Sequence, residues 1–305
     1  MTVAVKSRSK SLKDMELPGG TKTVEDALTA ISKANRNISK NRIRLTYLKE
    51  TKQVAITSDD FFTDGCETQV FVKDIGPQVS WRLVFCVEYI GPILVHSLFY
   101  WLSTTDFGAK LHSPSRRPNP FVNQLAYYMV IAHYTKRELE SLFLHKFSHA
   151  TMPLFNIFKN SFHYWVLSGA ISAGYFGYGF PLTDAQLFRI YSMLKLNNLS
   201  RLIGLFALSE VWNFYVHYKL RKWGDAQKKK GVIQRVPLED GIFKIFVAPN
   251  YTFEVLSWFF FTVVFKLNLF AVFFLFVSAG QMYLWAMKKN KKYGTKRAFL
   301  IPFVF

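Results

Sequence analysis

The chain has 305 residues, of which 50% are hydrophobic and 17% aromatic, and its formal net charge is +19. Its apolar residues gather in runs close to the ~20 residues that a transmembrane helix needs, which excludes an ordinary soluble protein. The aromatic residues lie inside these runs and not among the Lys and Arg residues, so the positive charge argues for loops beside a membrane and against nucleic-acid binding. Two cysteines without C-x-x-C spacing predict neither a disulfide framework nor a zinc site.

Residues 1–79 have the pattern of a small soluble domain. Alternating side chains predict strands near residues 2–7, 12–17, 43–47 and 69–73. Between the second and third strands, Thr23 precedes Asp26 by three residues and apolar residues follow at helical spacing, which predicts a helix capped by Thr23. The order β-β-α-β-β predicts a ubiquitin-like β-grasp, an α+β domain.

Residues 80–305 contain six apolar runs that predict membrane-spanning helices near 80–102, 121–143, 157–179, 198–218, 252–268 and 269–287. The third run is the weakest, because polar residues such as Lys159 and His163 crowd its start. Residues 181–197 are too polar to span and are expected at the membrane interface, with a short helix starting at Asp184. The predicted fold is therefore mainly α, a polytopic membrane bundle of about six transmembrane helices after the ubiquitin-like domain.

Lys and Arg residues are distributed unequally among the predicted loops. The loop 219–249 holds eight and the tail 288–305 holds six, whereas the loop 103–120 on the opposite side holds three. Because cytosolic loops carry the excess of positive charge, both termini are expected in the cytosol.

Polar side chains recur every four residues near the cytosolic end of the fourth run. Asn213, His217 and Arg221 share one helix face, and an Arg at the membrane surface suits the phosphates of a nucleotide. The alternative is that His217 and Arg221 are interfacial side chains whose polar ends reach toward water.

The start of the fifth run places an amide, a phenol and a carboxylate at the membrane edge. Asn250 and Glu254 share a helix face, and Tyr251 is offset from them by about 100°. Asn250 also suits a helix cap, and Tyr251 an aromatic anchor at the interface. A carboxylate one turn inside a span is costly, so Glu254 indicates a functional group.

Charges interrupt the second run, where Lys136 and Arg137 follow a His-Tyr pair. An ion pair between Lys136 and Glu140 at a helix end is the structural alternative. His145 and His149 are also four residues apart, but no third ligand is evident and no metal site is expected.

Basic residues, among them Lys289, cluster with Tyr293 directly after the sixth run. Such a cluster is also typical of an orientation signal or of lipid contact. The apolar chain end that follows indicates a tail that folds back, which would bring Lys289 and Tyr293 to the same cytosolic mouth.

Together these segments resemble the steroid 5α-reductase family, and most closely the very-long-chain trans-2-enoyl-CoA reductases of fungi. The resemblance covers the whole chain and is carried by the 213–221 face and by residues 76–82, 235–237, 248–254 and 297–305. It implies NADPH as hydride donor, a long-chain enoyl-CoA as substrate, and the last step of fatty-acid elongation in the endoplasmic reticulum, with its product supplying sphingolipids. It also implies contact with membrane lipids and, as partners, the condensing enzyme, the ketoacyl-CoA reductase and the hydroxyacyl-CoA dehydratase of that cycle.

The resemblance also implies roles for single residues. Tyr251 corresponds to the catalytic tyrosine, and Lys136 and Arg137 to a His-Tyr-x-Lys-Arg motif associated with activity. Steroid reductases have Asp where this chain has His217 and His where it has Lys289. The implied NADPH contacts are Asn213, His217, Arg221, Asn250, Glu254, Lys289 and Tyr293.

Enoyl reduction requires hydride at the β-carbon and an acid for the α-carbon. A phenol, with an ordinary pKa near ~10, is a poor acid unless neighbouring cations stabilise the phenolate, and Lys136 or Arg137 is expected to do so. Two alternatives stay open: a sterol or polyprenol reductase on the same scaffold, and a non-enzymatic membrane scaffold. A transporter is not favoured, because no inverted repeat is evident.

Overall fold

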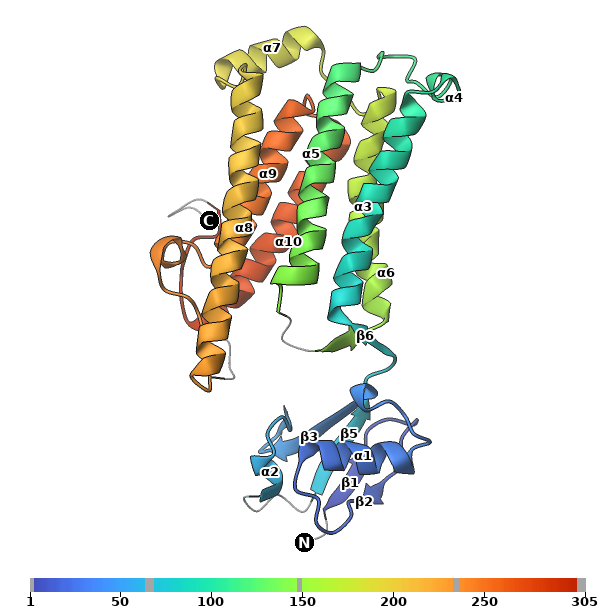
Figure 1. The fold of residues 1–305 in the computed structure, drawn as a ribbon, viewed down its shortest axis with the longest axis vertical. Coiled ribbons are helices and arrows are strands. Elements are labelled where there is room, and N and C mark those ends of the chain that lie inside the picture. Colours follow the sequence, from blue (N-terminus) through green and yellow to red (C-terminus); the bar gives the residue numbers. More distant parts are fainter. Residues whose placement is uncertain (1–2, 64–68, 147–149, 233–235, 301–305) are drawn as a thin grey trace. The chain divides into compact units, whose positions relative to one another are not determined.

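The computed structural model describes residues 3–63, 69–146, 150–232 and 236–300 and is mainly helical (Figure 1). The chain divides into two compact units, residues 1–81 with 149–156 and residues 82–148 with 157–305. Several residues that entered the sequence predictions lie outside the described residues: Thr2, Cys66, His149, Arg235 and residues 301–305.

The first unit contains a five-stranded sheet in the order β2-β1-β5-β3-β4. The central strands β1 and β5 are parallel, and all other neighbours are antiparallel. Helix α1 packs on the sheet through Ala27 and Ile31, which share a core with Val5 and Val70. The elements are β1 (Ala4–Ser7), β2 (Met15–Glu16), α1 (Val24–Ala34), η1 (Lys40–Arg42), β3 (Ile43–Lys49), β4 (Lys52–Ala55), α2 (Asp60–Thr63) and β5 (Gln69–Asp74).

The predicted cap of α1 is confirmed. Thr23 Oγ1 accepts a hydrogen bond from Asp26 N at 3.0 Å, and Asp26 Oδ2 accepts one from Thr23 N at 3.2 Å. The four predicted strands are also present, but strand β4 was missed. Its short sequence has little apolar alternation, and its extended shape comes from pairing with β3 across a turn in which Glu50 has a φ of 55°.

A second, two-stranded sheet ends the first unit and was also missed. It pairs β6 (Gln78–Ser80) with β7 (Thr151–Pro153), two segments far apart in the sequence. Trp81 reinforces the pair by donating its indole N–H to Thr151 O at 2.9 Å. Only the contact between distant segments defines these strands, so a local pattern does not reveal them.

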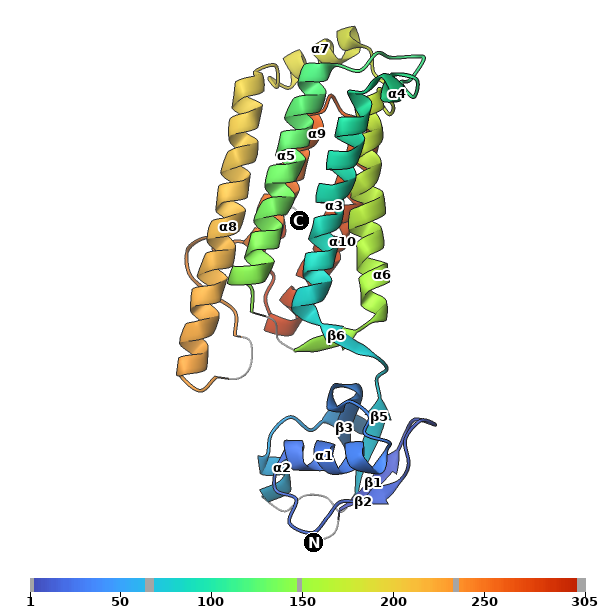
Figure 2. The same cartoon turned by 45° about the vertical axis from the view of Figure 1, so that its right-hand side comes forward.

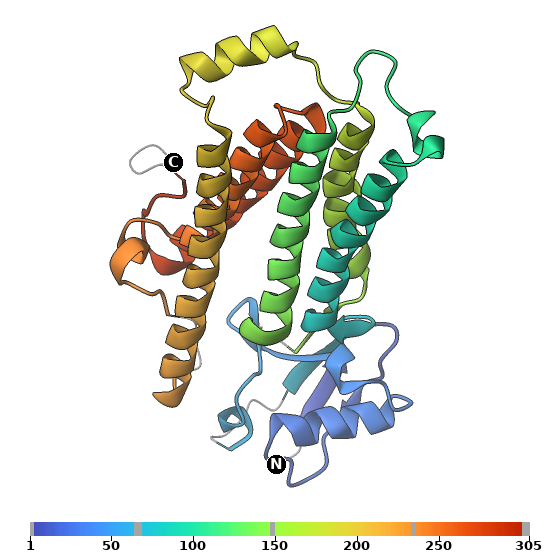
Figure 3. The ribbon, with the colours of Figure 1, turned by 45° about the horizontal axis from the view of Figure 1, so that its top comes forward.

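The second unit is a bundle whose long helices lie alongside one another (Figures 2 and 3). Each of the six apolar runs coincides with a helical segment, and the short helix at Asp184 is present as predicted. Helices α8 and α9 pack closely along their length, and α9 also packs on α10. The helical elements are α3 (Trp81–Ser103), α4 (Asp106–Ala109), α5 (Pro120–Leu139), α6 (Phe155–Ser161), α7 (Asp184–Met193), α8 (Leu199–Lys229), η5 (Gly241–Lys244), α9 (Pro249–Val264) and α10 (Leu269–Tyr293).

Two helical segments are irregular. Helix α5 continues as a π-helix, η2 (Glu140–Leu144), and α6 continues first as a π-helix, η3 (Phe162–Ser168), and then as a 3₁₀ helix, η4 (Gly169–Phe176). Such irregular turns often mark functional sites or sequences under strain. Among the described residues, α3 and α10 are long and apolar enough to cross a membrane.

Candidate active site

Asn213 lies at the junction of α8 and α9 and is fully buried. Its Nδ2 donates to the carbonyl oxygen of Asn250 at 2.8 Å and to Glu254 Oε2 at 3.1 Å. Its Oδ1 accepts a hydrogen bond from Lys136 Nζ at 2.5 Å. The structure therefore brings together four residues that the sequence predicted from three separate segments.

His133 and Glu210 belong to the same cluster and were not among the predicted site residues. His133 Nδ1 lies 2.8 Å from Glu210 Oε1, and His133 Nε2 lies 3.2 Å from Glu254 Oε1. Glu210 Oε2 lies 2.7 Å from Lys136 Nζ. Glu210 precedes Asn213 by one helical turn inside an apolar run, and this position was a usable signal that sequence reasoning passed over.

Arg137 is the centre of a neighbouring cluster. It donates from Nη1 to Glu140 Oε2 at 2.5 Å and from Nη2 to the hydroxyl of Tyr89 at 2.9 Å. His217 Nδ1 lies 3.2 Å from Arg137 Nη1 and 3.1 Å from Glu140 Oε2. The predicted alternative, an ion pair between Lys136 and Glu140, is therefore wrong, since Glu140 pairs with Arg137 and Lys136 pairs with Glu210.

Glu140, His145 and His217 present ligand-type atoms within 4.8 Å of one another. The Arg137 guanidinium, however, bonds Glu140 and lies against His217. A divalent cation would have to displace this fixed positive charge, so the donor set is a poor fit for a metal ion. His149, the predicted companion of His145, lies outside the described residues.

Tyr251 is half-buried near the start of α9 and packs beside Trp285. Lys289 Nζ lies over its ring, 4.3 Å from the ring centroid. Lys136 and Arg137, the cations expected to support this phenol, instead direct their charged ends at carboxylates and at Tyr89. The cation that the structure places against Tyr251 is Lys289.

A small pocket of about 60 Å³ brings together three of the predicted cofactor residues, Asn250, Lys289 and Tyr293. Arg297 also lines it. The side-chain oxygen Oδ1 of Asn250 is buried and has no hydrogen-bond partner among the residues that the structure describes, which makes it an acceptor for a ligand donor.

Arg221 is not part of this pocket. Its Nη1 donates to Leu144 O at 2.6 Å and its Nε to Asp225 Oδ2 at 3.0 Å. Ion pairs with Lys146 and Arg221 lower the pKa of Asp225. The guanidinium thus joins α8 to the end of η2, on the side of the cluster around Arg137.

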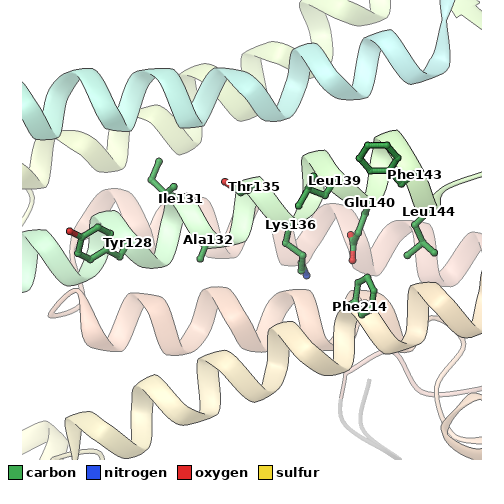
Figure 4. A pocket seen from close by; sticks show the side chains of 10 residues that line it. All are labelled: Tyr128, Ile131, Ala132, Thr135, Lys136, Leu139, Glu140, Phe143, Leu144 and Phe214. Carbon is green, nitrogen blue, oxygen red and sulfur yellow. The ribbon is translucent and has the colours of Figure 1, made fainter.

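An apolar groove of about 860 Å³ lies between α5 and α8 (Figure 4). In Figure 4, Lys136 and Glu140 point from the helix of α5 and η2 toward Phe214 on α8. Lys136 also belongs to the buried polar cluster, so this groove and that cluster adjoin. The other lining residues are Tyr128, Ile131, Ala132, Thr135, Leu139, Phe143 and Leu144.

Comparisons with known proteins show the family to which this chain belongs. A family model described as 3-oxo-5-alpha-steroid 4-dehydrogenase matches residues 150–305. A very-long-chain enoyl-CoA reductase of Dictyostelium discoideum is 34% identical over 98% of both chains. A Schizosaccharomyces pombe protein provisionally named an enoyl reductase is 34% identical over 99% of both chains, and a Caenorhabditis elegans protein provisionally named a very-long-chain enoyl-CoA reductase is 31% identical over 90% of this chain and 91% of its own.

The chain therefore belongs to the 3-oxo-5-alpha-steroid 4-dehydrogenase family of membrane proteins. Within this family, the relatives that match it over nearly its full length include very-long-chain enoyl-CoA reductases.

Proposed function

We propose that this protein is an NADPH-dependent reductase that converts very-long-chain trans-2-enoyl-CoA to saturated acyl-CoA. This is the last step of microsomal fatty-acid elongation, and its products would supply sphingolipids. The observation that carries the proposal is similarity to enoyl-CoA reductases over nearly the full chain. The buried polar clusters beside an apolar groove support it, because the reaction needs charged groups next to a very apolar substrate.

The described residues fit a nicotinamide dinucleotide. Asn250 Oδ1 is a buried acceptor without a hydrogen-bond partner among the described residues, and Lys289 supplies positive charge in the same pocket, whereas the charge of Arg297 is paired with Glu239. Asn213 donates to the backbone carbonyl of Asn250 and to the carboxylate of Glu254, and so ties the start of α9 to α8. The residues proposed to hold NADPH are Asn213, His217, Arg221, Asn250, Glu254, Lys289 and Tyr293. When bound, the cofactor supplies the hydride for the β-carbon.

Tyr251 is the proposed donor of the proton for the α-carbon. Its phenol lies under Lys289, and an ammonium beside a phenol stabilises the phenolate that proton transfer leaves. Negative charge also develops on the thioester oxygen as the hydride arrives. Lys136 and Arg137 are the proposed source of the positive potential that stabilises it.

The groove between α5 and α8 is the proposed site of the acyl chain. Its walls are apolar apart from Thr135, Lys136 and Glu140, and Lys136 connects it with the cluster around Asn213 and Glu254. An acyl chain in this groove would have its thioester end close to positive charge and the rest of its length among apolar side chains.

The proposed setting is the endoplasmic reticulum membrane, with six spans and both termini in the cytosol. Residues 1–79 are the proposed cytosolic ubiquitin-like domain and residues 80–305 the reductase domain. The sheet order β2-β1-β5-β3-β4, with α1 between β2 and β3, supports the β-grasp assignment. The other elongation enzymes are the proposed partners.

The experiment is to purify the protein in detergent and follow NADPH absorbance. Oxidation is expected when a long-chain trans-2-enoyl-CoA is added, and the matched saturated acyl-CoA should give none. A Tyr251→Phe sample prepared in the same way controls for contaminating reductases. Oxidation with a sterol enone or a polyprenol but not with the enoyl-CoA would contradict the proposal.

A further inference from the structure

Five side chains from α5, α8 and α9, two of them buried and three partly buried, form a closed ring of polar contacts. Lys136 contacts Asn213, Asn213 contacts Glu254, Glu254 contacts His133, His133 contacts Glu210, and Glu210 returns to Lys136. The five separations run from 2.5 to 3.2 Å. Two helical pairs one turn apart, 133 with 136 and 210 with 213, set its geometry.

The donors and acceptors of this ring are consistent in one protonation state. Lys136 donates to Asn213 and forms an ion pair with Glu210, and the amide of Asn213 donates to Glu254 and accepts from Lys136. An ionised carboxylate accepts only, so each nitrogen of His133 must carry a hydrogen to face Glu210 and Glu254. A neutral imidazole at His133 would turn a nitrogen lone pair toward one of the two carboxylates.

The charges lead to the same state. Glu210 and Glu254 carry two negative charges, and Lys136 carries one positive charge. A doubly protonated His133 makes the ring neutral, whereas a neutral histidine leaves one uncompensated negative charge in the protein interior. Tyr134 and Trp258 pack against the imidazole in T-shaped, edge-to-face contacts and offer it no charge.

We infer that His133 is a positioning residue that works as a fixed imidazolium, holding Glu254 of α9 and Glu210 of α8 in register so that Glu254 is oriented for the cofactor. The orientation part rests on the proposed assignment of Glu254 to NADPH binding. The ring leaves Glu254 little rotational freedom, because Oε1 is held by His133 and Oε2 by Asn213.

The first test is nuclear magnetic resonance of the full chain labelled with ¹⁵N-histidine in detergent, at neutral pH. The chain has seven histidines, and the signal of His133 is recognised as the one that is absent from the His133→Gln variant. Wild type should show an imidazolium for this residue. Glu210→Gln should show a neutral imidazole at His133, because the glutamine amide can donate a hydrogen bond to one imidazole nitrogen. A neutral imidazole at His133 in the wild type would overturn the inference.

The second test measures NADPH affinity by fluorescence titration. His133→Gln should weaken binding by about tenfold or more, because a buried carboxylate then faces an amide oxygen. The double variant His133→Gln with Glu210→Gln should recover most of the loss, since two amides satisfy each other. A purely structural role for His133 would give no such recovery. The matched control is His163→Gln, whose side chain contacts Ser278 outside the ring and should leave affinity unchanged.

The failure modes are separable. If His133→Gln binds NADPH like the wild type while Glu254→Ala binds weakly, the positioning role of His133 is wrong. If Glu254→Ala itself binds NADPH normally, the proposed assignment of Glu254 to cofactor binding is wrong. The inference that His133 orients Glu254 for the cofactor is then wrong as well. In that case the ¹⁵N-histidine spectrum still decides whether His133 is an imidazolium.

Discussion

At the scale of single residues, the site depends on polar groups that are held by partners on other helices. Tyr251 is a clear case. Its surroundings combine apolar packing from Trp285 with one ammonium, that of Lys289, over the ring. This environment suits a phenol that must give up a proton and leave a stabilised anion.

Tyr251→Phe is expected to lower kcat by roughly 10²–10⁴-fold, because it removes the proposed proton donor while keeping the ring. NADPH affinity should change little, because the Lys289 contact is made with the ring face. Steady-state kinetics with a long-chain enoyl-CoA, together with NADPH titration, check both parts. Turnover within a few-fold of wild type in a folded sample would show that another group delivers the proton.

At the scale of secondary-structure elements, close packing between helical segments determines which substitutions the bundle tolerates. Helix α3 approaches η3 at Gly91, and Trp165 of η3 donates its indole N–H to Val87 O at 2.8 Å. A Cβ added at Gly91 would lie 1.9 Å from Trp165 Nε1. The rigid indole must therefore move for any larger residue to fit.

Gly91→Ala is expected to destabilise the second unit by about 1–3 kcal/mol through overpacking. The matched control is Gly280→Ala on α10, where an added Cβ meets nothing within 4 Å. The control should be neutral or slightly stabilising, because alanine favours the helix by ~0.5–1 kcal/mol. Thermal unfolding of both variants in the same detergent makes the comparison, and equal midpoints would refute the packing argument.

In the first unit, the end of β5 is tied to η1 by an ion pair. Asp74 accepts hydrogen bonds from Arg42 Nη2 at 2.7 Å and Nε at 3.2 Å, and from Gly76 N at 2.8 Å. The hydrogen bonds from Arg42 lower the pKa of Asp74 below its ordinary value of 3.8. The stabilisation is therefore present above about pH 4 and is lost as the pH falls toward the lowered pKa.

Hydrogen exchange of the β5 peptides in the full chain, corrected for intrinsic rates, is expected to speed up as the pH falls below about 4. Asp74→Asn should exchange faster at neutral pH and should lose this part of the pH dependence, because its amide does not ionise. Glu16→Gln is the control, because Glu16 is an exposed carboxylate of the same unit. An unchanged pH dependence in Asp74→Asn would contradict the assignment.

At the scale of the whole molecule, the polar cluster around Asn213 and the apolar groove meet at Lys136. One of its sides faces the ring around Asn213, and another lines the apolar groove between α5 and α8. This arrangement accounts for how one protein would bind a charged cofactor and a very long acyl chain together, each in an environment that matches its polarity.

Ala132→Phe should fill part of the groove and reduce kcat/KM for a very-long-chain enoyl-CoA by roughly tenfold or more, since each excluded methylene costs ~0.8 kcal/mol of burial. Reduction of crotonyl-CoA, which has hardly any chain to exclude, should be nearly unaffected. Ala207→Phe is the matched control, because Ala207 is an exposed residue of α8 that does not line the groove. An equal loss for both substrates would indicate that the acyl chain lies elsewhere.

The sequence by itself determined the positions of the long helices, the start of α1 and most candidate site residues. Six apolar runs, the capping box at Thr23 and the polar residues around Asn213 and Asn250 are local patterns, and local patterns follow from residue spacing alone. A carboxylate such as Glu254 inside an apolar run is visible for the same reason.

Only the tertiary structure decided which side chains are partners. Lys136 pairs with Glu210 on another helix and not with Glu140 on its own, Lys289 lies over Tyr251, and His133 joins two carboxylates. Strand β4 and the pair β6–β7 likewise exist through pairing with other strands. Such contacts depend on how helices and strands align across long sequence separations, and no single segment contains that information.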